Sequence, residues 1–185
     1  MNTIKSSTNL WWTIFAGSVV GLVASFIQTI ERINFAKHPL QPLTCDLNAV
    51  FSCKNVFDAW QSSVFGFSNS LMCIVFFTLI AGVAVAAATG SSINKILRLI
   101  LQFFAIFFLG FGAWYLWQSN YIIGYICIFC LACYGAVILI NWALLRVNAK
   151  DLHIRKKIIS HGIDTFLWLL WTLIIVAMII FKFWL

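Results

Sequence analysis

Four of the six cysteines are spaced as two pairs that could exchange disulfides. Cys45 and Cys53 are close in the chain and lie in a loop, which can bring them within the roughly 4.4–6.8 Å between Cα atoms that a disulfide needs. Cys127 and Cys130 form a Cys-X-X-Cys motif, a spacing typical of redox-active thiols. Because exchange requires direct attack of one sulfur on another, one pair must move, and we expect this to be the pair in the loop.

Other chemistries explain these cysteines less well. A c-type haem site requires a histidine directly after the second motif cysteine, where this chain has Leu131. A structural zinc site requires four ligands, whereas the loop supplies only His38, Cys45 and Cys53, so we expect no metal. The two remaining cysteines, Cys73 and Cys133, are expected to pack as small hydrophobic side chains within helices.

The composition indicates a membrane protein. Hydrophobic residues make up 63% of the chain, mean hydropathy is +0.98, and only 9% of residues are charged, against roughly 25% in soluble domains. Five apolar runs are long enough to cross a bilayer and must then be helical. They cover residues 10–30, 64–88, 96–117, 121–145 and 163–185. The first run is too long for a signal peptide, so we predict an all-α membrane protein with one domain over 1–185.

Basic residues predict the orientation of the chain. The net charge is +7, but the lysines and arginines lie in short loops between the runs, so we expect a lipid bilayer and no nucleic acid as partner. More of them fall on the inner side if the N-terminus is cytoplasmic, above all in segment 146–157. The C-terminus and loop 31–62 would then lie outside, where disulfides persist.

Helix geometry gives an expected depth for the second cysteine pair. If a helix begins at Tyr121, Cys127 lies about 9 Å and Cys130 about 13 Å below its outer end. That end is the helix N-terminus, whose partial positive charge favours a thiolate. In the loop, residues 53–60 have helical spacing with Val56, Phe57 and Trp60 on one side, so this segment could lie on the bilayer surface.

The motifs that carry these cysteines resemble the vitamin K epoxide reductase family, which includes bacterial homologues. The likeness covers about 10–145. It lies in Cys45-Asp-Leu-Asn-Ala-Val-Phe-Ser-Cys53, in Ser68-Asn69-Ser70, and in Cys127-Ile-Phe-Cys130-Leu-Ala-Cys-Tyr134. The order and spacing of the three motifs agree with that family. A second bacterial family of disulfide-forming quinone enzymes fits less well, because its Cys-X-X-Cys pair comes first in the chain.

The resemblance implies a four-helix transmembrane bundle around a quinone, with a fifth helix at its side. Cys45 would exchange with a thioredoxin-like partner, and Cys53 would attack or be joined to Cys127. Cys130 would pass electrons to the quinone. Many bacterial members carry a fused thioredoxin-like domain after the fifth helix; this chain ends at Leu185, so we expect the partner to be a separate protein.

The resemblance also implies that Asn69 and Tyr134 hydrogen-bond the quinone oxygens. The residues themselves leave other roles open: Asn69 could bond a neighbouring helix, and Tyr134 could be an ordinary buried tyrosine. The expected helix starts also conflict with a shared ligand. They set Tyr134 about 20 Å below Tyr121 but Asn69 only about 8 Å below Val64.

The main hypothesis is a quinone-dependent thiol–disulfide oxidoreductase of a bacterial inner membrane. It would pass electrons from a periplasmic thioredoxin-like protein through two cysteine pairs to a ubiquinone, menaquinone or vitamin K type quinone, and so support disulfide formation. An alternative within the family is reduction of vitamin K quinone or its epoxide. A third possibility is a non-catalytic membrane protein with structural disulfides.

Overall fold

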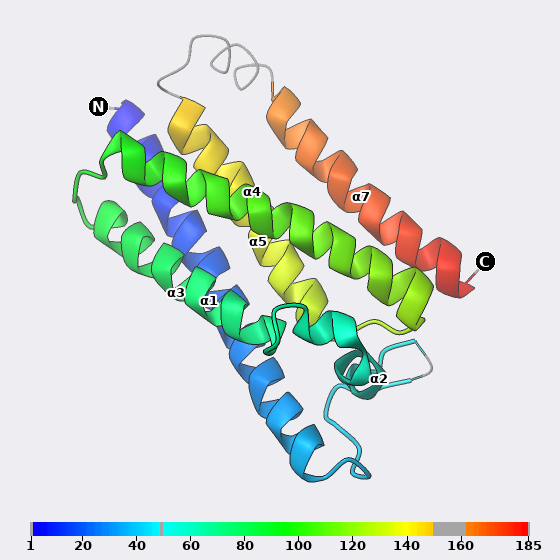
Figure 1. Ribbon diagram of the computed structural model, residues 1–185. Coiled ribbons are helices and arrows are strands. Elements are labelled where there is room, and N and C mark those ends of the chain that lie inside the picture. The colour runs from blue at the N-terminus through cyan, green and yellow to red at the C-terminus, as the bar shows by residue number, and fades with distance from the viewer. Residues whose placement is uncertain (1, 49, 150–161, 185) are drawn as a thin grey trace.

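The computed structural model describes residues 2–48, 50–149 and 162–184 (Figure 1). Its long helices are α1 (Asn2–Lys37), α3 (Asn69–Ala88), α4 (Lys95–Gln118), α5 (Ile128–Asn148) and α7 (Ile163–Trp184). Between α1 and α3 lie a short helix, α2 (Cys53–Asp58), and a 3₁₀ turn, η1 (Trp60–Ser63). A π-helical turn, η2 (Ser119–Ile123), follows α4.

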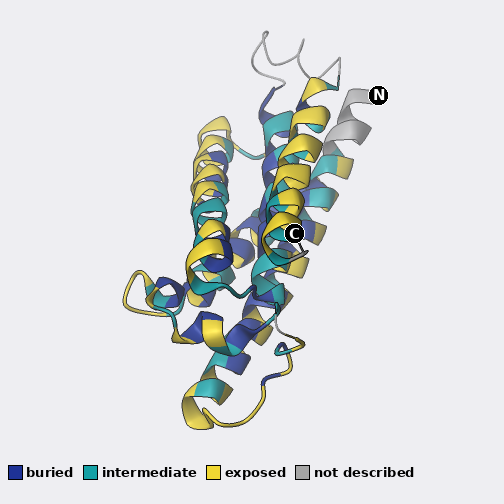
Figure 2. Ribbon diagram, turned by 90° about the vertical axis from the view of Figure 1, so that its right-hand side faces the viewer, coloured by how far each residue is buried: buried dark blue, intermediate teal, exposed yellow. Residues whose placement is uncertain are grey.

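The prediction of an all-α membrane protein is confirmed. Among the described residues, five helices are long and apolar enough to span a membrane. Helix α1 packs against α3 and α5, and α4 packs against α5, so these four form the bundle while α7 runs along its outside (Figure 1). Buried residues face inward and exposed apolar ones outward (Figure 2). The chain is therefore an integral membrane protein whose apolar outer surface faces lipid.

Close packing of α1 on α3 depends on a glycine. The ring of Phe77, which is fully buried, occupies the space beside Gly21, and a Cβ added there would come within 2.3 Å of the ring. A side chain at this position would push the two helices apart or displace the ring. Gly21 is thus required by a close approach between helices, as small residues often are in membrane bundles.

Polar side chains tie α7 to the bundle near both of its ends. At one end Arg146 of α5 donates to both carboxylate oxygens of Asp164, at 2.6 and 3.1 Å, and to Thr165 Oγ1 at 2.8 Å. At the other end Asn120 of η2 donates to the carbonyl oxygen of Met178 at 3.1 Å. Lipid tails are as apolar as leucine, so such bonds hold a peripheral helix more specifically than apolar contact does.

Two of the expected helix starts were wrong, and a glycine lies in each region. The run expected to begin at 121 becomes helical only at Ile128, because Gly124 adopts a left-handed conformation (φ +78°) that ends the π turn. Likewise the helix expected from 64 begins at Asn69, after the left-handed Gly66 (φ +81°). Apolar composition identifies the membrane segments but not the turns at their ends.

The expectation for residues 53–60 is corrected in part. The segment does begin with a helix, α2, and Val56 and Phe57 share one face of it. This face is buried against the cluster that contains Cys45 and Cys53. Trp60 lies in the separate turn η1 and is 67% exposed. Helix α2 therefore covers one end of the bundle with its apolar face inward.

Replacing Gly21 by alanine should destabilise the bundle by roughly 1–3 kcal/mol, because the new methyl group must displace the Phe77 ring. Thermal unfolding in detergent measures this. Gly82→Ala is the matched control, since a Cβ at Gly82 in α3 meets nothing within 4 Å. If both variants unfold at the wild-type temperature, the close approach of α1 and α3 is not as described.

Candidate active site

A short parallel β-bridge joins the cysteine loop to the segment before α5. Phe51 pairs with Ile126; Ser52 N donates to Ile126 O at 3.2 Å, and Ile126 N donates to Val50 O at 2.9 Å. Cys53 comes two positions after Phe51, and Cys127 directly follows Ile126. The bridge therefore brings a cysteine of each pair to the same place, although they are far apart in the chain.

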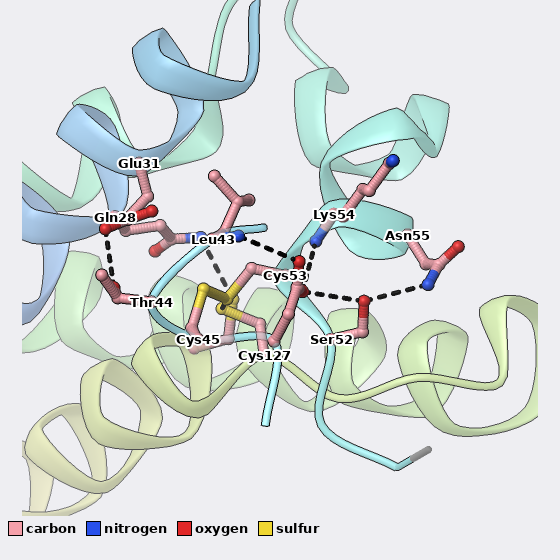
Figure 3. Close-up of a disulfide and its surroundings, with 12 residues drawn as sticks. Gln28, Glu31, Leu43, Thr44, Cys45, Ser52, Cys53, Lys54, Asn55 and Cys127 are labelled. Carbon is pink, nitrogen blue, oxygen red and sulfur yellow. Dashed lines mark hydrogen bonds between the residues drawn. A yellow bond between two sulfur atoms is a disulfide. The ribbon is translucent and has the colours of Figure 1, made fainter. Parts of the chain in front are cut away.

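The two cysteine pairs meet at this bridge (Figure 3). Cys45 and Cys53 form a disulfide with their Cα atoms 5.7 Å apart. The Sγ of Cys127 lies 3.4 Å from the Sγ of Cys53, and all three residues are fully buried. Direct sulfur attack between the pairs therefore needs no large movement, and the movement expected of the loop is needed only for access from outside.

Asp46, next to Cys45, organises the loop around the disulfide. Its carboxylate accepts hydrogen bonds from Leu43 N (3.3 Å), Ser52 Oγ (2.9 Å) and Lys54 N (3.2 Å). Burial raises the pKa of Asp46, but these hydrogen bonds outweigh it, so the net pKa lies below the usual value. One carboxylate thus links both sides of the disulfide loop.

Cys127 is the N-cap residue of α5, and Cys130 lies in the first turn. The expected depths of about 9 and 13 Å are therefore corrected, because the helix begins at Ile128 and not at 121, while the pair does stand at its start. The neighbouring Cys130 thiol lowers the pKa of Cys127, against the effect of burial, and the N–H groups of Cys130 and Phe129 add to this shift. Of the two inner thiols, Cys127 is the one in contact with Cys53.

Cys130 lines a cavity formed by residues of α1, α3, α4 and α5 together with Ser62 of η1. The cavity is small, about 60 Å³. Its lining includes polar side chains of α1 and α3 and aromatic side chains of α4 and α5, namely Gln28, Asn69, Ser70, Phe108, Tyr115 and Tyr134. A second, apolar space of about 410 Å³ opens between α3 and α4, and Phe76 and Phe108, stacked with ring centres 4.2 Å apart, are among its walls.

Asn69 and Tyr134 both line the cavity beside Cys130. Both helices begin later than expected, so Asn69 lies at the start of α3 and Tyr134 only about 9 Å into α5, and both side chains still reach the same cavity. Asn69 Nδ2 donates to Gln61 O at 2.7 Å, while its buried Oδ1 has no hydrogen-bond partner among the described residues. Tyr134 packs its ring on Gly112 and accepts a hydrogen bond from Trp171 Nε1 of α7 at 2.9 Å.

Comparison with known proteins agrees with this geometry. The sequence profile described as the vitamin K epoxide reductase family matches residues 12–145. The chain belongs to the vitamin K epoxide reductase family. The match covers the four bundle helices and both cysteine pairs, and α7 lies outside it. No curated protein matches the chain.

Membership of the vitamin K epoxide reductase family indicates a quinone-linked thiol–disulfide oxidoreductase.

The remaining cysteines fit a packing role in part. The Cys133 thiol is buried, donates to Gly21 O at 3.7 Å and lies 3.3 Å from Ser25 Oγ. Cys73 is only partly buried and lines the cavity. No cluster of three or more potential metal ligands occurs within the described part of the chain.

Two side chains at Cys130 were missed by sequence reasoning. Gln28 Nε2 donates to the Cys130 sulfur at 3.2 Å, and the buried Tyr115 lines the same cavity as Cys130. A glutamine within an apolar membrane run is itself a signal of function, since buried polar groups in membranes are costly. Tyr115 carries no such signal, because it stands in an aromatic-rich helix.

Replacing Cys45 by serine should convert the close sulfur contact into a covalent bond. Cys53 then becomes a free thiol 3.4 Å from Cys127, so a mild oxidant such as diamide is expected to form a Cys53–Cys127 disulfide. Peptide mapping by mass spectrometry identifies the bond. Cys73→Ser is the control and should keep Cys45 joined to Cys53. Absence of the new bond after oxidation would mean that the two sulfurs do not meet.

Replacing Asp46 by asparagine should loosen the disulfide loop. Loss of about 1 kcal/mol of hydrogen bonding corresponds to roughly fivefold faster reduction of Cys45–Cys53 by a water-soluble phosphine. Because the folded pKa of Asp46 is lowered, its stabilising effect is present above about pH 4 and is lost as the pH falls through the folded pKa. Reduction of the wild type should therefore accelerate at acid pH, whereas the variant should lack this acceleration.

The control for this experiment is Asp58→Asn, at the exposed end of α2. It should leave both the rate and its pH dependence unchanged. Equal rates for all three proteins across the pH range would contradict the role of the Asp46 carboxylate.

Proposed function

We propose that this chain oxidises the dithiol of a separate thioredoxin-like protein and transfers the electrons through its two cysteine pairs to a membrane quinone. The observation that carries the proposal is the 3.4 Å contact between Cys53 and Cys127, with Cys130 opening onto a cavity behind them. In this geometry one sulfur of each pair can react with the other, and the innermost sulfur faces a site within the membrane.

The electron balance follows from thiol–disulfide exchange. A partner thiolate attacks Cys45 of the Cys45–Cys53 disulfide, and the partner leaves as a disulfide while Cys45 and Cys53 become thiols. Cys53 then attacks Cys127 of an oxidised inner pair, which forms a Cys53–Cys127 bond and releases Cys130 as a thiolate. Cys45 next attacks Cys53, which restores Cys45–Cys53 and leaves Cys127 and Cys130 as thiols. The structure has the loop pair oxidised and the inner pair reduced, which matches the state after this last exchange.

The residues around the cavity fit a quinone. A bound quinone would accept two electrons and two protons, and so return the inner pair to a disulfide. Asn69, with a buried oxygen that has no partner, and Tyr134 are the proposed polar contacts of the ring. The apolar space between α3 and α4 suits an isoprenoid tail. Since the cavity is small, the Phe76–Phe108 pair would have to part to admit a ring.

The proposal includes an orientation. The end of the bundle that carries loop 31–62 would face the periplasm of a bacterial inner membrane, and the N-terminus would lie in the cytoplasm. The distribution of lysine and arginine supports this, because Arg146 lies in the last turn of α5, at the opposite end of that helix from Cys127 and Cys130. The rest of the basic segment, residues 150–157, lies outside the described residues. Disulfide formation also requires an oxidising compartment on the cysteine side.

Purified protein supplied with a reduced thioredoxin-like protein should reduce a short-chain quinone. Cys130→Ala should abolish turnover, because the inner pair can no longer form a disulfide. Absorbance of the quinone measures the rate, and ubiquinone, menaquinone and vitamin K epoxide analogues are compared to rank the substrates. Activity that survives in Cys130→Ala would refute the proposed electron path.

A trapping experiment with the same thioredoxin-like protein distinguishes an enzyme from a membrane protein whose disulfides are structural. When the partner is supplied in its oxidised form, the free Cys45 thiol of Cys53→Ala attacks the partner disulfide, and no Cys53 thiol is present to displace the partner. A mixed disulfide should therefore accumulate and be visible on non-reducing gels. A purely structural role predicts lower stability of this variant and no mixed disulfide.

A further inference from the structure

Helix α1 places a buried amide on the innermost sulfur. Gln28 is 9% exposed and directs its Nε2 at Cys130 Sγ from 3.2 Å. An unpaired amide in an apolar interior costs several kcal/mol, so a membrane helix keeps one only where it has a partner. A neutral thiol is a weak acceptor and compensates poorly.

The bond becomes strong when the sulfur is charged. A hydrogen bond to an anion is roughly twice as strong as one between neutral groups, and a low dielectric strengthens it further. Cys130 becomes an anion when the Cys127–Cys130 disulfide is opened. Attack by Cys53 on Cys127 forms the Cys53–Cys127 bond, breaks the Cys127–Cys130 bond and leaves the electron pair on the Cys130 sulfur.

A second potential donor lines the same cavity from another helix. Tyr115 of α4 is buried, and its hydroxyl is the second polar group that this cavity offers to Cys130 beside Gln28. Two donors from two helices are therefore available where the charge appears, as oxyanion-hole donors are in acyl transfer. Cys127, in contrast, is turned toward the loop and Cys53.

We infer that Gln28 and Tyr115 form a thiolate-binding site that stabilises Cys130 as the leaving group when the inner disulfide is opened. This inference rests on the proposed relay, in which the inner pair alternates between disulfide and dithiol. Gln28 contacts the reacting sulfur and so is catalytic, and Tyr115 supplies a second donor at the same cavity. They make the inner pair easier to reduce by the loop pair and hold the released Cys130 thiolate at the cavity.

The test is the redox equilibrium of the inner pair in the full-length protein in detergent micelles. Wild type and variants are equilibrated in dithiothreitol buffers of stepped potential, quenched with a membrane-permeant maleimide, and the Cys127–Cys130 peptide is quantified by mass spectrometry. Gln28→Leu should disfavour the reduced form about tenfold, a fall in potential of about 30 mV for two electrons. Tyr115→Phe should shift it in the same direction.

Gln102→Leu is the matched control. Gln102 is also a buried glutamine in a membrane helix, but its Nε2 donates to Asn141 Oδ1 at 3.2 Å, away from the cysteines. Gln102→Leu should lower thermal stability and leave the potential at its wild-type value. If Gln28→Leu fails to fold, Tyr115→Phe, which removes only one oxygen atom, carries the test.

The outcomes separate this inference from the proposed function. Potentials unchanged in Gln28→Leu and Tyr115→Phe overturn the inference, even if quinone reduction is observed. An equal shift in Gln102→Leu also overturns it, because the effect would then be structural. A shift confined to Gln28→Leu and Tyr115→Phe supports it, including in a protein that fails to reduce any quinone.

Discussion

Contact between Cys53 and Cys127 is the interaction on which the rest of the arrangement depends. The two side chains approach to 3.4 Å because the segments that lead into them pair in a parallel bridge between Phe51 and Ile126. That bridge requires Gly124 to end the preceding turn, so that the chain runs extended into α5. A helix that continued from α4 into α5 would leave no free backbone groups to receive the loop.

The loop disulfide is held unequally on its two sides. Cys53 is fixed by the bridge and by the first turn of α2, which is buried in the cluster that covers the bundle end. On the Cys45 side the loop is held by the burial of Leu43, worth about 1.5–3 kcal/mol, and by a few hydrogen bonds such as Thr44 Oγ1 to Glu31 Oε1 (2.6 Å). Cys45 is fully buried, so a partner can reach it only when this side opens, at a cost of several kcal/mol. Cys53 can stay in contact with Cys127 while the Cys45 side of the loop is open.

Apolar run length was sufficient to predict the helices and the fold class. The two cysteine pairs were also apparent from spacing, since their chemistry depends on residue type. The starts of α3 and α5 were not predictable, because Gly66 and Gly124 interrupt runs that remain apolar throughout. Gln28 and Tyr115 could not be assigned to the cavity at Cys130 either, because their place there depends on how α1 and α4 pack around α5, which single-helix periodicity does not determine.

Hydrogen bonding in the cavity suits both redox forms of a quinone under the proposed function. Quinone carbonyls only accept hydrogen bonds, so their contacts must donate. Tyr134 accepts from Trp171 of α7, which leaves its own proton free to donate. The reduced ring carries hydroxyl groups that also donate, and the unpartnered Oδ1 of Asn69 can accept from one of them. Because Trp171 lies outside the region matched by the family, α7 adds to this chain a contact that the four-helix bundle alone does not provide.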